Sequence, residues 1–373
     1  MKWDYLVVGA GFFGCVLAER LANDAGASVL VIDKRDHIGG NCHSQENPDT
    51  GIEYHTYGTH IFHTSSRMAW DYITKFSDFN GYHHKVLTVH NGKTYQFPIN
   101  LATINSFYHL NLTPVRAREF LASEILREGI REATNLEERA ISLVGRPLYE
   151  AFIRGYTTKQ WDSDPQYLPS EIIDRLPVRY DYDSSYFPDA RWQGIPLGGY
   201  ASVFERLLDS PRIEVRLNCD YFEHRDELSV KHKVIYTGPI DRYFDYMHGK
   251  LEWRSVEQMV EVRSEADFQG TAVMNFADLT VPHTRIHEPR HLHLERNYPK
   301  DRTVILYEIP KLRDEEPCYP VRTMNNMSLL KKYLDLAKRE KHVIIGGRLG
   351  GYAYIDMDRT ILSALNSYRE NFA

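Results

Sequence analysis

Three glycines near the start of the chain have the spacing of a phosphate-binding turn. Gly9, Gly11 and Gly14 form a GxGxxG motif between the apolar run YLVV and the helix-like run FFGCVLAER. Glycines in this pattern let the backbone turn tightly and approach a pyrophosphate at the N-terminus of the following helix. Asp33 ends the next apolar run, about 20 residues further on, where its carboxylate can accept hydrogen bonds from a ribose hydroxyl. The sequence therefore predicts a dinucleotide-binding βαβ unit, in preference to a glycine turn that only packs a helix on a sheet.

A second glycine pair bears on which dinucleotide is bound, because FAD and NAD share the first motif. The segment RDHIGGNCH contains Gly39 and Gly40, which resemble the extended motif of FAD-binding flavoproteins, followed by Asn41. Glycines there let the backbone pass close to a cofactor, and the Asn41 amide adds a donor and an acceptor. Near the C-terminus, GGRLGGYAYIDMD predicts a glycine-rich turn before a helix that starts near Asp358. The N-terminus of that helix could face a flavin and stabilise negative charge on it, so we expect FAD.

Aromatic and basic residues in the rest of the chain form a second group that could do chemistry. Phe152 and Tyr156 are four residues apart, so on a helix they share one face and could contact a base such as uracil; the alternative is that they are ordinary core aromatics. Arginine suits a diphosphate because its guanidinium offers paired donors and is always charged. The arginines and tyrosines that follow are Arg175, Tyr182, Tyr186, Arg285, Tyr319, Arg348 and Tyr354. Together they predict a site for a nucleoside diphosphate.

The elements that must position these residues change in character along the chain. Residues 4–40 read as strand, glycine turn, helix and strand, and residues 100–160 are helical, with Thr113 and Asn135 as helix starts. From about 175 to 340 the runs VRYDYDSSYF, TAVMNFAD and TVILYEIP predict antiparallel strands. PRIEVRLNCDYF and HKVIYTG interrupt them and are interpreted as returns to the first domain. The predicted fold class is α/β, with a Rossmann-like domain assembled from separate stretches.

The composition limits the class of protein. The chain has 373 residues, 42% of them hydrophobic and 26% charged, which is typical of a globular protein large enough for two or three domains. The formal net charge of −6 disfavours a nucleic-acid partner, and no apolar run is long enough for a membrane span. The four cysteines show neither a disulfide framework nor zinc spacing, and a strand follows Met1 too closely for a signal peptide. We therefore expect a cytoplasmic protein without nucleic-acid or membrane partners.

Four motifs together resemble those of one enzyme family. GYTTKQW, RLPVRYDYDSSYF, TRIHEPRHLH and GRLGGYAYIDMD occur in the order and at the spacings of prokaryotic UDP-galactopyranose mutases, and the resemblance covers nearly the whole chain. It implies a homodimer and a discontinuous Rossmann-like FAD-binding domain with a small helical domain, which carries a substrate loop, and an antiparallel β-sheet domain. The implied boundaries are 1–80, 190–240 and 340–373 for the FAD-binding domain, 100–178 for the helical domain, and 81–99, 179–189 and 241–339 for the sheet domain.

The resemblance also implies roles for individual residues, carried over motif by motif. The implied catalytic residues are Arg175, Arg285 and His63, with Arg175 on a loop that closes over the substrate. The residues implied to bind FAD are Gly9, Gly11, Phe13, Gly14, Asp33, Lys34, Gly40, Asn41, His60, Ile61, Arg348, Ile355, Asp356 and Met357. The residues implied to bind the UDP-sugar are His84, Phe152, Tyr156, Thr157, Trp161, Arg175, Tyr182, Tyr186, Asn275, Arg285, Tyr319 and Tyr354.

The activity implied by the resemblance is the interconversion of UDP-galactopyranose and UDP-galactofuranose, which supplies galactofuranose for cell-surface glycans. In the family, N5 of reduced FAD attacks the anomeric carbon and expels UDP, the sugar ring opens as an iminium forms, and the ring closes through the other hydroxyl with no net redox change. A general acid or base for the ring oxygens is not evident in the sequence. One departure from the family is Thr59 in YGTHIFHT, where proline is usual, and it leaves the rigidity of this loop open.

Other interpretations of the same residues stay open. A flavin oxidoreductase would share the FAD motif, although the arginines and tyrosines fit a diphosphate better than an amine or an apolar substrate. A non-catalytic nucleotide-binding module is the third interpretation.

His60 and His63 could form part of a metal site, but no carboxylate or cysteine partner accompanies them, and we expect no metal. His291 and His293 are interpreted as structural or solvent-facing, and Lys159 as a structural or solvated charge.

Overall fold

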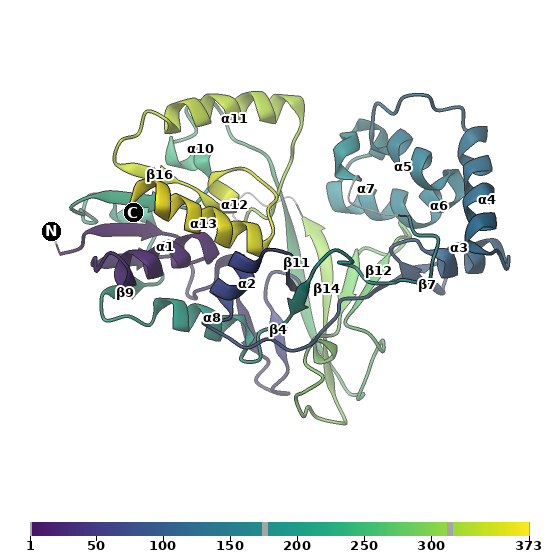
Figure 1. The fold of residues 1–373 in the computed structure, drawn as a ribbon, viewed down its shortest axis with the longest axis horizontal. Helices are drawn as coiled ribbons and strands as arrows, with labels where there is room; N and C mark the ends of the chain where they lie inside the picture. Colours follow the sequence, from purple (N-terminus) through teal and green to yellow (C-terminus); the bar gives the residue numbers. More distant parts are fainter. Residues whose placement is uncertain (1, 174–177, 312–315, 373) are drawn as a thin grey trace.

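A five-stranded parallel sheet occupies one side of the molecule (Figure 1). The computed structural model describes residues 2–173, 178–311 and 316–372. The strand order is β16, β10, β1, β2, β9, and every neighbouring pair is parallel. The strands are β1 (Tyr5–Val8), β2 (Val29–Ile32), β9 (Ile213–Arg216), β10 (Lys233–Tyr236) and β16 (Val343–Ile345). The two runs interpreted as returns to the first domain therefore supply strands to the sheet that the N-terminal residues begin.

Helices cover both faces of this sheet. Alternate residues of β1 point to opposite sides, so Val7 packs against helices on one face and Leu6 against helices on the other. The first face is covered by α1 (Phe12–Asn23), α2 (Arg67–Ile73), α8 (Gly199–Leu208) and α13 (Met357–Asn371). On the second side lie α9 (Tyr221–His224), α10 (Ile240–Tyr243) and α11 (Met324–Ala337). Burial on both faces explains why the central strands are almost wholly apolar.

A seven-stranded sheet lies between the parallel sheet and a group of helices (Figure 1). Its order is β15, β11, β14, β13, β12, β6, β7, and every pair is antiparallel except β12 with β6. The strands are β6 (Val86–His90), β7 (Lys93–Phe97), β11 (Trp253–Arg263), β12 (Val273–Phe276), β13 (Arg285–His287), β14 (Thr303–Lys311) and β15 (Tyr319–Pro320). The runs TAVMNFAD and TVILYEIP therefore form strands, as predicted.

The run VRYDYDSSYF does not form the predicted strand. It is irregular and makes one isolated bridge, between Ser185 and Lys85. The carboxylates of Asp181 and Asp183 each accept a hydrogen bond of 2.9 Å from the backbone amide two residues further on. Such local side-chain turns compete with a strand ladder. The prediction was wrong because the hydrogen bonds of the aspartates outweigh the strand propensity of the aromatic residues around them.

The helical group begins where the sequence predicted its helix starts. Thr113 is the N-cap of α4, whose first residue is Pro114. The Asn135 side chain caps α5 by accepting a hydrogen bond of 3.0 Å from the Glu138 amide. The group comprises α3 (Leu101–Tyr108), α4 (Pro114–Arg127), α5 (Leu136–Val144), α6 (Arg146–Tyr149), a π-helical turn η2 (Glu150–Arg154) and α7 (Gly155–Trp161).

Short elements connect the three parts. Two two-stranded sheets pair β3 (Ser44–Glu46) with β4 (Glu53–His55) and β5 (Phe62–Thr64) with β8 (Trp192–Gly194). The short helical turns are η1 (Gly40–Cys42), η3 (Pro165–Tyr167), η4 (Ser170–Ile172), η5 (Pro289–Leu292) and α12 (Gly347–Gly350). Within the described ranges, no helix is both long enough and apolar enough to cross a lipid bilayer.

Candidate functional site

A cavity of about 930 Å³ opens at the carboxyl ends of the parallel strands. Val8, Asp33 and Tyr236 line it where β1, β2 and β10 end, and Gly347 lines it just after β16. On its other side lie residues of the seven-stranded sheet, among them Arg285 on β13. Ligands of parallel α/β sheets bind outside the carboxyl ends of the strands. The cavity therefore joins the position expected for a dinucleotide to a second wall supplied by the other sheet.

The glycine turn lies at the first end of the cavity. Gly9 has a φ of +108°, and a Cβ atom there would lie 2.0 Å from the hydroxyl oxygen of Thr237. A Cβ atom on Gly14 would lie 2.1 Å from the Gly9 carbonyl oxygen, so Gly14 lets α1 pack closely on the turn. Gly11 is the N-cap of α1 and offers no side chain to the first amide groups of the helix. Gly9 and Gly11 line the cavity, whereas Gly14 lies behind them.

Asp33 and Gly40 complete this end of the cavity. The Asp33 carboxylate accepts hydrogen bonds of 2.8 Å from the Ala10 amide and 3.0 Å from the Arg35 amide. It therefore stabilises the glycine turn as well as lining the cavity. A Cβ atom on Gly40 would lie 3.1 Å from the Gly11 Cα atom. The Gly39–Gly40 pair therefore passes directly beside the GxGxxG turn.

The other residues predicted to bind the cofactor come from separate segments of the chain. The helix predicted near Asp358 begins at Met357, and its N-cap, Asp356, makes no side-chain capping bond. The first turn of α13 therefore presents uncapped amide groups at the cavity. The predicted cofactor residues that line the cavity besides those above are Phe13, Lys34, Asn41, His60, Ile61, Arg348, Ile355, Asp356 and Met357.

Arg348 and two tyrosines form one cationic wall of the cavity. The guanidinium lies 4.5 Å from the ring centroid of Tyr354 and 5.5 Å from that of Tyr319. The two rings stack with centroids 5.7 Å apart. One guanidinium nitrogen donates a hydrogen bond of 2.7 Å to the Cys318 carbonyl oxygen, while Nε is buried and has no hydrogen-bond partner among the described residues. An unpartnered buried donor is costly, so this wall suits an anionic ligand.

Arg285 forms the facing cationic group and is held from two neighbouring strands. The register places it opposite Asn275 on β12 and Glu308 on β14. Its Nε donates a hydrogen bond of 3.2 Å to the Asn275 side-chain oxygen, and its guanidinium lies 3.7 Å from the Glu308 carboxylate. The ring of Tyr156 lies against it, 5.6 Å from centroid to guanidinium carbon. These contacts fix the direction of the guanidinium before any ligand binds.

Arg285 and Glu308 keep their charges at physiological pH. Burial raises the pKa of Glu308, but the Arg285 charge and a hydrogen bond from His287 outweigh it and hold the pKa at about 2. Burial works against the charge on Arg285, whereas Tyr156 and Glu308 favour it, and its pKa stays above the usual value. Arg285 is therefore a cation and Glu308 an anion over the whole physiological range.

Two histidines that line the cavity, His60 and His84, are neutral. Burial and the Arg348 charge lower the pKa of His60 to about 4, and burial and the Arg285 charge lower that of His84 to about 3. The predicted substrate residue Tyr186 also lines the cavity, with its ring edge-on to His84 at 5.2 Å. The positive charge that a ligand meets here comes from the arginines.

His63, predicted to be catalytic, lines the cavity from β5. Its imidazole stacks on Phe187 with centroids 3.7 Å apart and an interplanar angle of 12°. Phe187 lines the cavity beside it. Stacking fixes the plane of the imidazole, so His63 presents one ring orientation to a ligand.

Two residues predicted to bind the substrate are instead packed in the core of the helical group. Phe152 is 3% exposed, and its ring lies edge-on to Tyr95 and Phe107 at 5.0 and 5.4 Å. Thr157 is also buried and does not line the cavity. The spacing of Phe152 and Tyr156 was compatible with a shared face, but the π-helical turn η2 ends between them. The placement of Phe152 matches the core-aromatic alternative.

Among the described residues, four further predicted substrate residues do not line the cavity, namely Tyr156, Trp161, Tyr182 and Asn275. Trp161 packs partly buried against the core of the helical group. Tyr182 is 66% exposed. Arg175 lies outside the described residues.

Sequence reasoning missed two buried residues of the site, His287 and Glu308, which both line the cavity. His287 follows Arg285 by two positions on β13, so both side chains lie on the same face of the sheet. Glu308 is a carboxylate within the apolar run TVILYEIP, and it is 1% exposed. A charged residue in an apolar strand is the signal that could have identified it, because such groups are buried only when paired.

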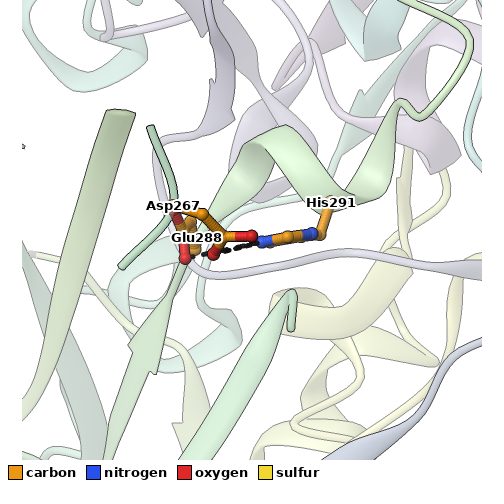
Figure 2. A group of neighbouring side chains, drawn as sticks. All are labelled: Asp267, Glu288 and His291. Atoms are coloured by element: carbon orange, nitrogen blue, oxygen red, sulfur yellow. Dashed lines mark hydrogen bonds and ion pairs between the residues drawn. The ribbon is translucent and has the colours of Figure 1, made fainter. Parts of the chain in front are cut away.

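Three side chains of types that can bind a metal, Asp267, Glu288 and His291, lie close together outside the cavity (Figure 2). The His291 Nε2 atom lies 3.1 Å from Asp267 and 3.5 Å from Glu288. The Glu288 carboxylate accepts hydrogen bonds of 2.9 and 2.8 Å from the backbone amides of Phe268 and Gln269. The carboxylates thus already have protein donors, and the group fastens the loop between β11 and β12.

The fold and the cavity define a dinucleotide-binding α/β protein with an adjoining arginine- and tyrosine-lined site. Comparison with known families agrees on both parts. The family model described as an NAD(P)-binding Rossmann-like domain matches residues 7–76, and the model described as UDP-galactopyranose mutase matches residues 151–354.

Full-length relatives carry related names. A probable UDP-galactopyranose mutase of Klebsiella pneumoniae is 39% identical over 98% of this chain and 94% of its own length. The dTDP-fucopyranose mutase of Escherichia coli is 36% identical over 96% of each chain. A crystal structure of reduced UDP-galactopyranose mutase shares the fold with a TM-score of 0.78 at 15% identity, covering 100% of this chain and 95% of that chain.

The chain belongs to the UDP-galactopyranose mutase family, whose named members are isomerases. This membership confirms the predicted family and the α/β fold class. It also favours the isomerase interpretation over the flavin oxidoreductase and the non-catalytic module.

Proposed function

We propose that this chain interconverts UDP-galactopyranose and UDP-galactofuranose, with FAD as its cofactor. The observation that carries the proposal is the continuity of one cavity from the glycine turn of α1 to Arg285 on β13. Its first end suits a dinucleotide and its second end suits a diphosphate. Family membership supplies the reaction class, which is isomerisation.

The residues present fit FAD at the first end of the cavity. Gly9 and Gly40 leave space that a Cβ atom could occupy only by clashing with Thr237 or crowding Gly11. The uncapped N-terminus of α1 can take the pyrophosphate, and the Asp33 carboxylate can take a ribose hydroxyl. When bound and reduced, FAD supplies the nucleophile needed at the anomeric carbon as the sugar leaves the diphosphate.

The protein's contribution is to bind and orient the nucleotide sugar. Arg285 meets one side of the diphosphate, and Tyr186, Tyr319 and Tyr354 donate hydrogen bonds to its oxygens without adding charge. Because Asn275 holds the Arg285 guanidinium in place, Arg285 also stabilises the negative charge that develops on the departing UDP. Arg175 lies outside the described residues, and its role at the diphosphate is proposed from the family resemblance alone.

The nucleoside end of the substrate belongs near Tyr156, whose ring already lies against Arg285. Contact of Phe152 with uracil needs a rearrangement of the helical group, because its ring is packed among Tyr95 and Phe107. The substrate contacts of Thr157, Trp161 and Tyr182 remain predictions. So do the covalent mechanism through N5 of FAD, the predicted domain boundaries, the homodimer, the cytoplasmic location and the supply of galactofuranose to cell-surface glycans.

A second candidate substrate is dTDP-fucopyranose. The Escherichia coli relative named for that substrate is nearly as similar to this chain as the Klebsiella pneumoniae relative, at 36% against 39% identity. Both substrates are nucleoside diphosphate sugars, so the arginines and tyrosines of the cavity suit either one.

The test is turnover of both nucleotide sugars by purified protein whose visible spectrum shows bound flavin. The protein is incubated with UDP-galactofuranose or dTDP-fucofuranose, with and without dithionite, and the products are separated by chromatography. We expect UDP-galactopyranose to form only under reducing conditions. Turnover of the dTDP-sugar alone would transfer the proposal to the second candidate, and no turnover of either sugar by reduced, flavin-loaded protein would overturn it.

A further inference from the structure

A hydrogen-bonded chain of three side chains runs along the cavity wall beside Arg285. The Thr59 hydroxyl oxygen lies 2.7 Å from His287 Nδ1, and His287 Nε2 lies 3.2 Å from the Glu308 carboxylate. All three residues line the cavity. His287 and Glu308 are 2% and 1% exposed, whereas Thr59 is only partly buried. The chain therefore leads from a buried carboxylate to a partly buried residue on the cavity wall.

The chemistry of the three groups fixes the direction of the hydrogen bonds. Glu308 is ionised, since its pKa is about 2, so its oxygens can only accept. The hydrogen bond to Glu308 then places a proton on His287 Nε2, and when the imidazole is neutral its Nδ1 atom is an acceptor. In that form the Thr59 hydroxyl donates to Nδ1. The remaining lone pairs of its oxygen are left to accept a hydrogen bond from a group in the cavity.

Isomerisation of a sugar ring needs a group of this kind. When a six-membered ring becomes a five-membered ring, the old ring oxygen gains a proton and another hydroxyl oxygen loses one. Arg285 stays protonated and cannot take that proton. His60 and His84 are weak bases, because their pKa values are lowered to about 4 and 3.

We propose that Thr59, His287 and Glu308 form a proton relay that serves the sugar hydroxyl groups. The inference rests on the proposed function and deepens it by assigning the general base. A sugar hydroxyl gives its proton to the Thr59 oxygen as the Thr59 proton passes to His287 Nδ1. The proton returns along the same route to the other sugar oxygen, so no proton is gained or lost in a turnover. Thr59 is the residue that touches the substrate, and His287 and Glu308 act through it.

The charged groups around His287 determine how well its imidazole can hold the transferred proton. The Glu308 carboxylate on β14 stabilises the imidazolium that forms. Arg285 lies two positions away on the same strand and is itself paired with Glu308 at 3.7 Å. The other titratable groups that face His287 are the imidazoles of His55, His60 and His84. Since the lowered pKa values of these three keep them neutral, Glu308 and Arg285 are the only charges of this set.

The relay is tested first with isosteric variants of Thr59. Thr59→Val keeps the shape of the side chain but removes the hydroxyl, and we expect kcat to fall by about 100-fold, while KM and the affinity for UDP change by less than about threefold. Thr59→Ser restores the hydroxyl and is expected to restore most of kcat. The control is Thr74→Val, whose hydroxyl bonds to the Trp70 carbonyl oxygen in helix α2, away from the cavity. A Thr59→Val enzyme with unchanged kcat would overturn the relay.

A second measurement is independent of turnover. Nitrogen NMR of protein labelled with ¹⁵N-histidine reports the tautomer of His287, whose signals are assigned by their loss in His287→Gln. We expect a proton on Nε2 and an Nδ1 signal that shifts in Thr59→Val. A neutral imidazole protonated on Nδ1 would overturn the relay whether or not the protein is a mutase. The expected tautomer in a protein without turnover would instead show that only the proposed function has failed.

Discussion

Lys159 donates a hydrogen bond of 2.7 Å to the carbonyl oxygen of Phe276, which ties helix α7 to the end of strand β12. Its ammonium group also lies 3.0, 3.0 and 2.9 Å from the carbonyl oxygens of Asp278, Val281 and His283. One carbonyl group at the end of β12 and three in the loop between β12 and β13 thus converge on one cation. Of the two interpretations that the sequence left open for Lys159, a structural charge and a solvated charge, these contacts match the first. Lys159 fixes the hairpin that carries Asn275 and Arg285.

We expect Lys159→Met to destabilise the fold by about 1–3 kcal/mol, because it leaves partly buried carbonyl groups without the lysine donor. Urea unfolding followed by circular dichroism measures the change. The matched control is Lys338→Met, since the Lys338 side chain is 76% exposed and forms only a surface ion pair with Asp335. An unchanged unfolding midpoint in Lys159→Met would show that water replaces the lysine without loss.

Arg285→Ala should lower kcat/KM by at least about 100-fold, because it removes a pre-oriented cation from the diphosphate site. Steady-state kinetics with reduced enzyme measures the loss, and UDP binding by calorimetry should weaken in parallel. Arg116→Ala is the control, because Arg116 is 73% exposed on helix α4. Near-normal turnover by Arg285→Ala would refute the role proposed for this residue.

Local sequence signals predicted the turns and helix starts well. The glycine turn, Asp33 and the starts of α4 and α5 depend on residues close together in the chain, and the structure has each of them where it was predicted. The reason is physical, because turns and caps are decided by neighbouring residues.

The contacts that join separate elements at the site could be predicted only in part. The Thr59–His287–Glu308 chain joins a loop to strands β13 and β14, and no local pattern records which segments become neighbours. Phe152 shows a second limit of prediction from local sequence. Its spacing from Tyr156 is helical, but periodicity does not say whether the shared face meets a ligand or the core, and packing against Tyr95 decided it.

Gly9→Ala should abolish flavin binding, because the new Cβ atom would lie 2.0 Å from the Thr237 hydroxyl oxygen in a backbone conformation with φ of +108°. The visible spectrum of the purified variant measures the loss directly. Gly249→Ala is a close control, since Gly249 has a φ of +105° but nothing within 4 Å of the added atom. If Gly9→Ala is as yellow as the wild type, the turn tolerates the methyl group and FAD binds without the close approach proposed here.

The His291 cluster links stability to pH (Figure 2). Burial works against protonation of His291, but its hydrogen bonds to Glu288 and Asp267 outweigh burial and raise its pKa. A raised pKa in the folded state stabilises the fold fully below the unfolded value of about 6.5. The stabilisation is lost as the pH rises through the higher folded value.

His291→Gln should therefore cost most stability near about pH 6 and progressively less as the pH rises toward about 9. The difference in unfolding free energy from the wild type, measured by urea titration at several pH values, tests this dependence. His342→Gln is the control, because His342 is exposed on the surface, and its difference should stay near zero throughout. A cost for His291→Gln that is constant, or that grows with pH, would mean that the imidazole fastens the loop in its neutral form, as a hydrogen-bond donor to Asp267 alone.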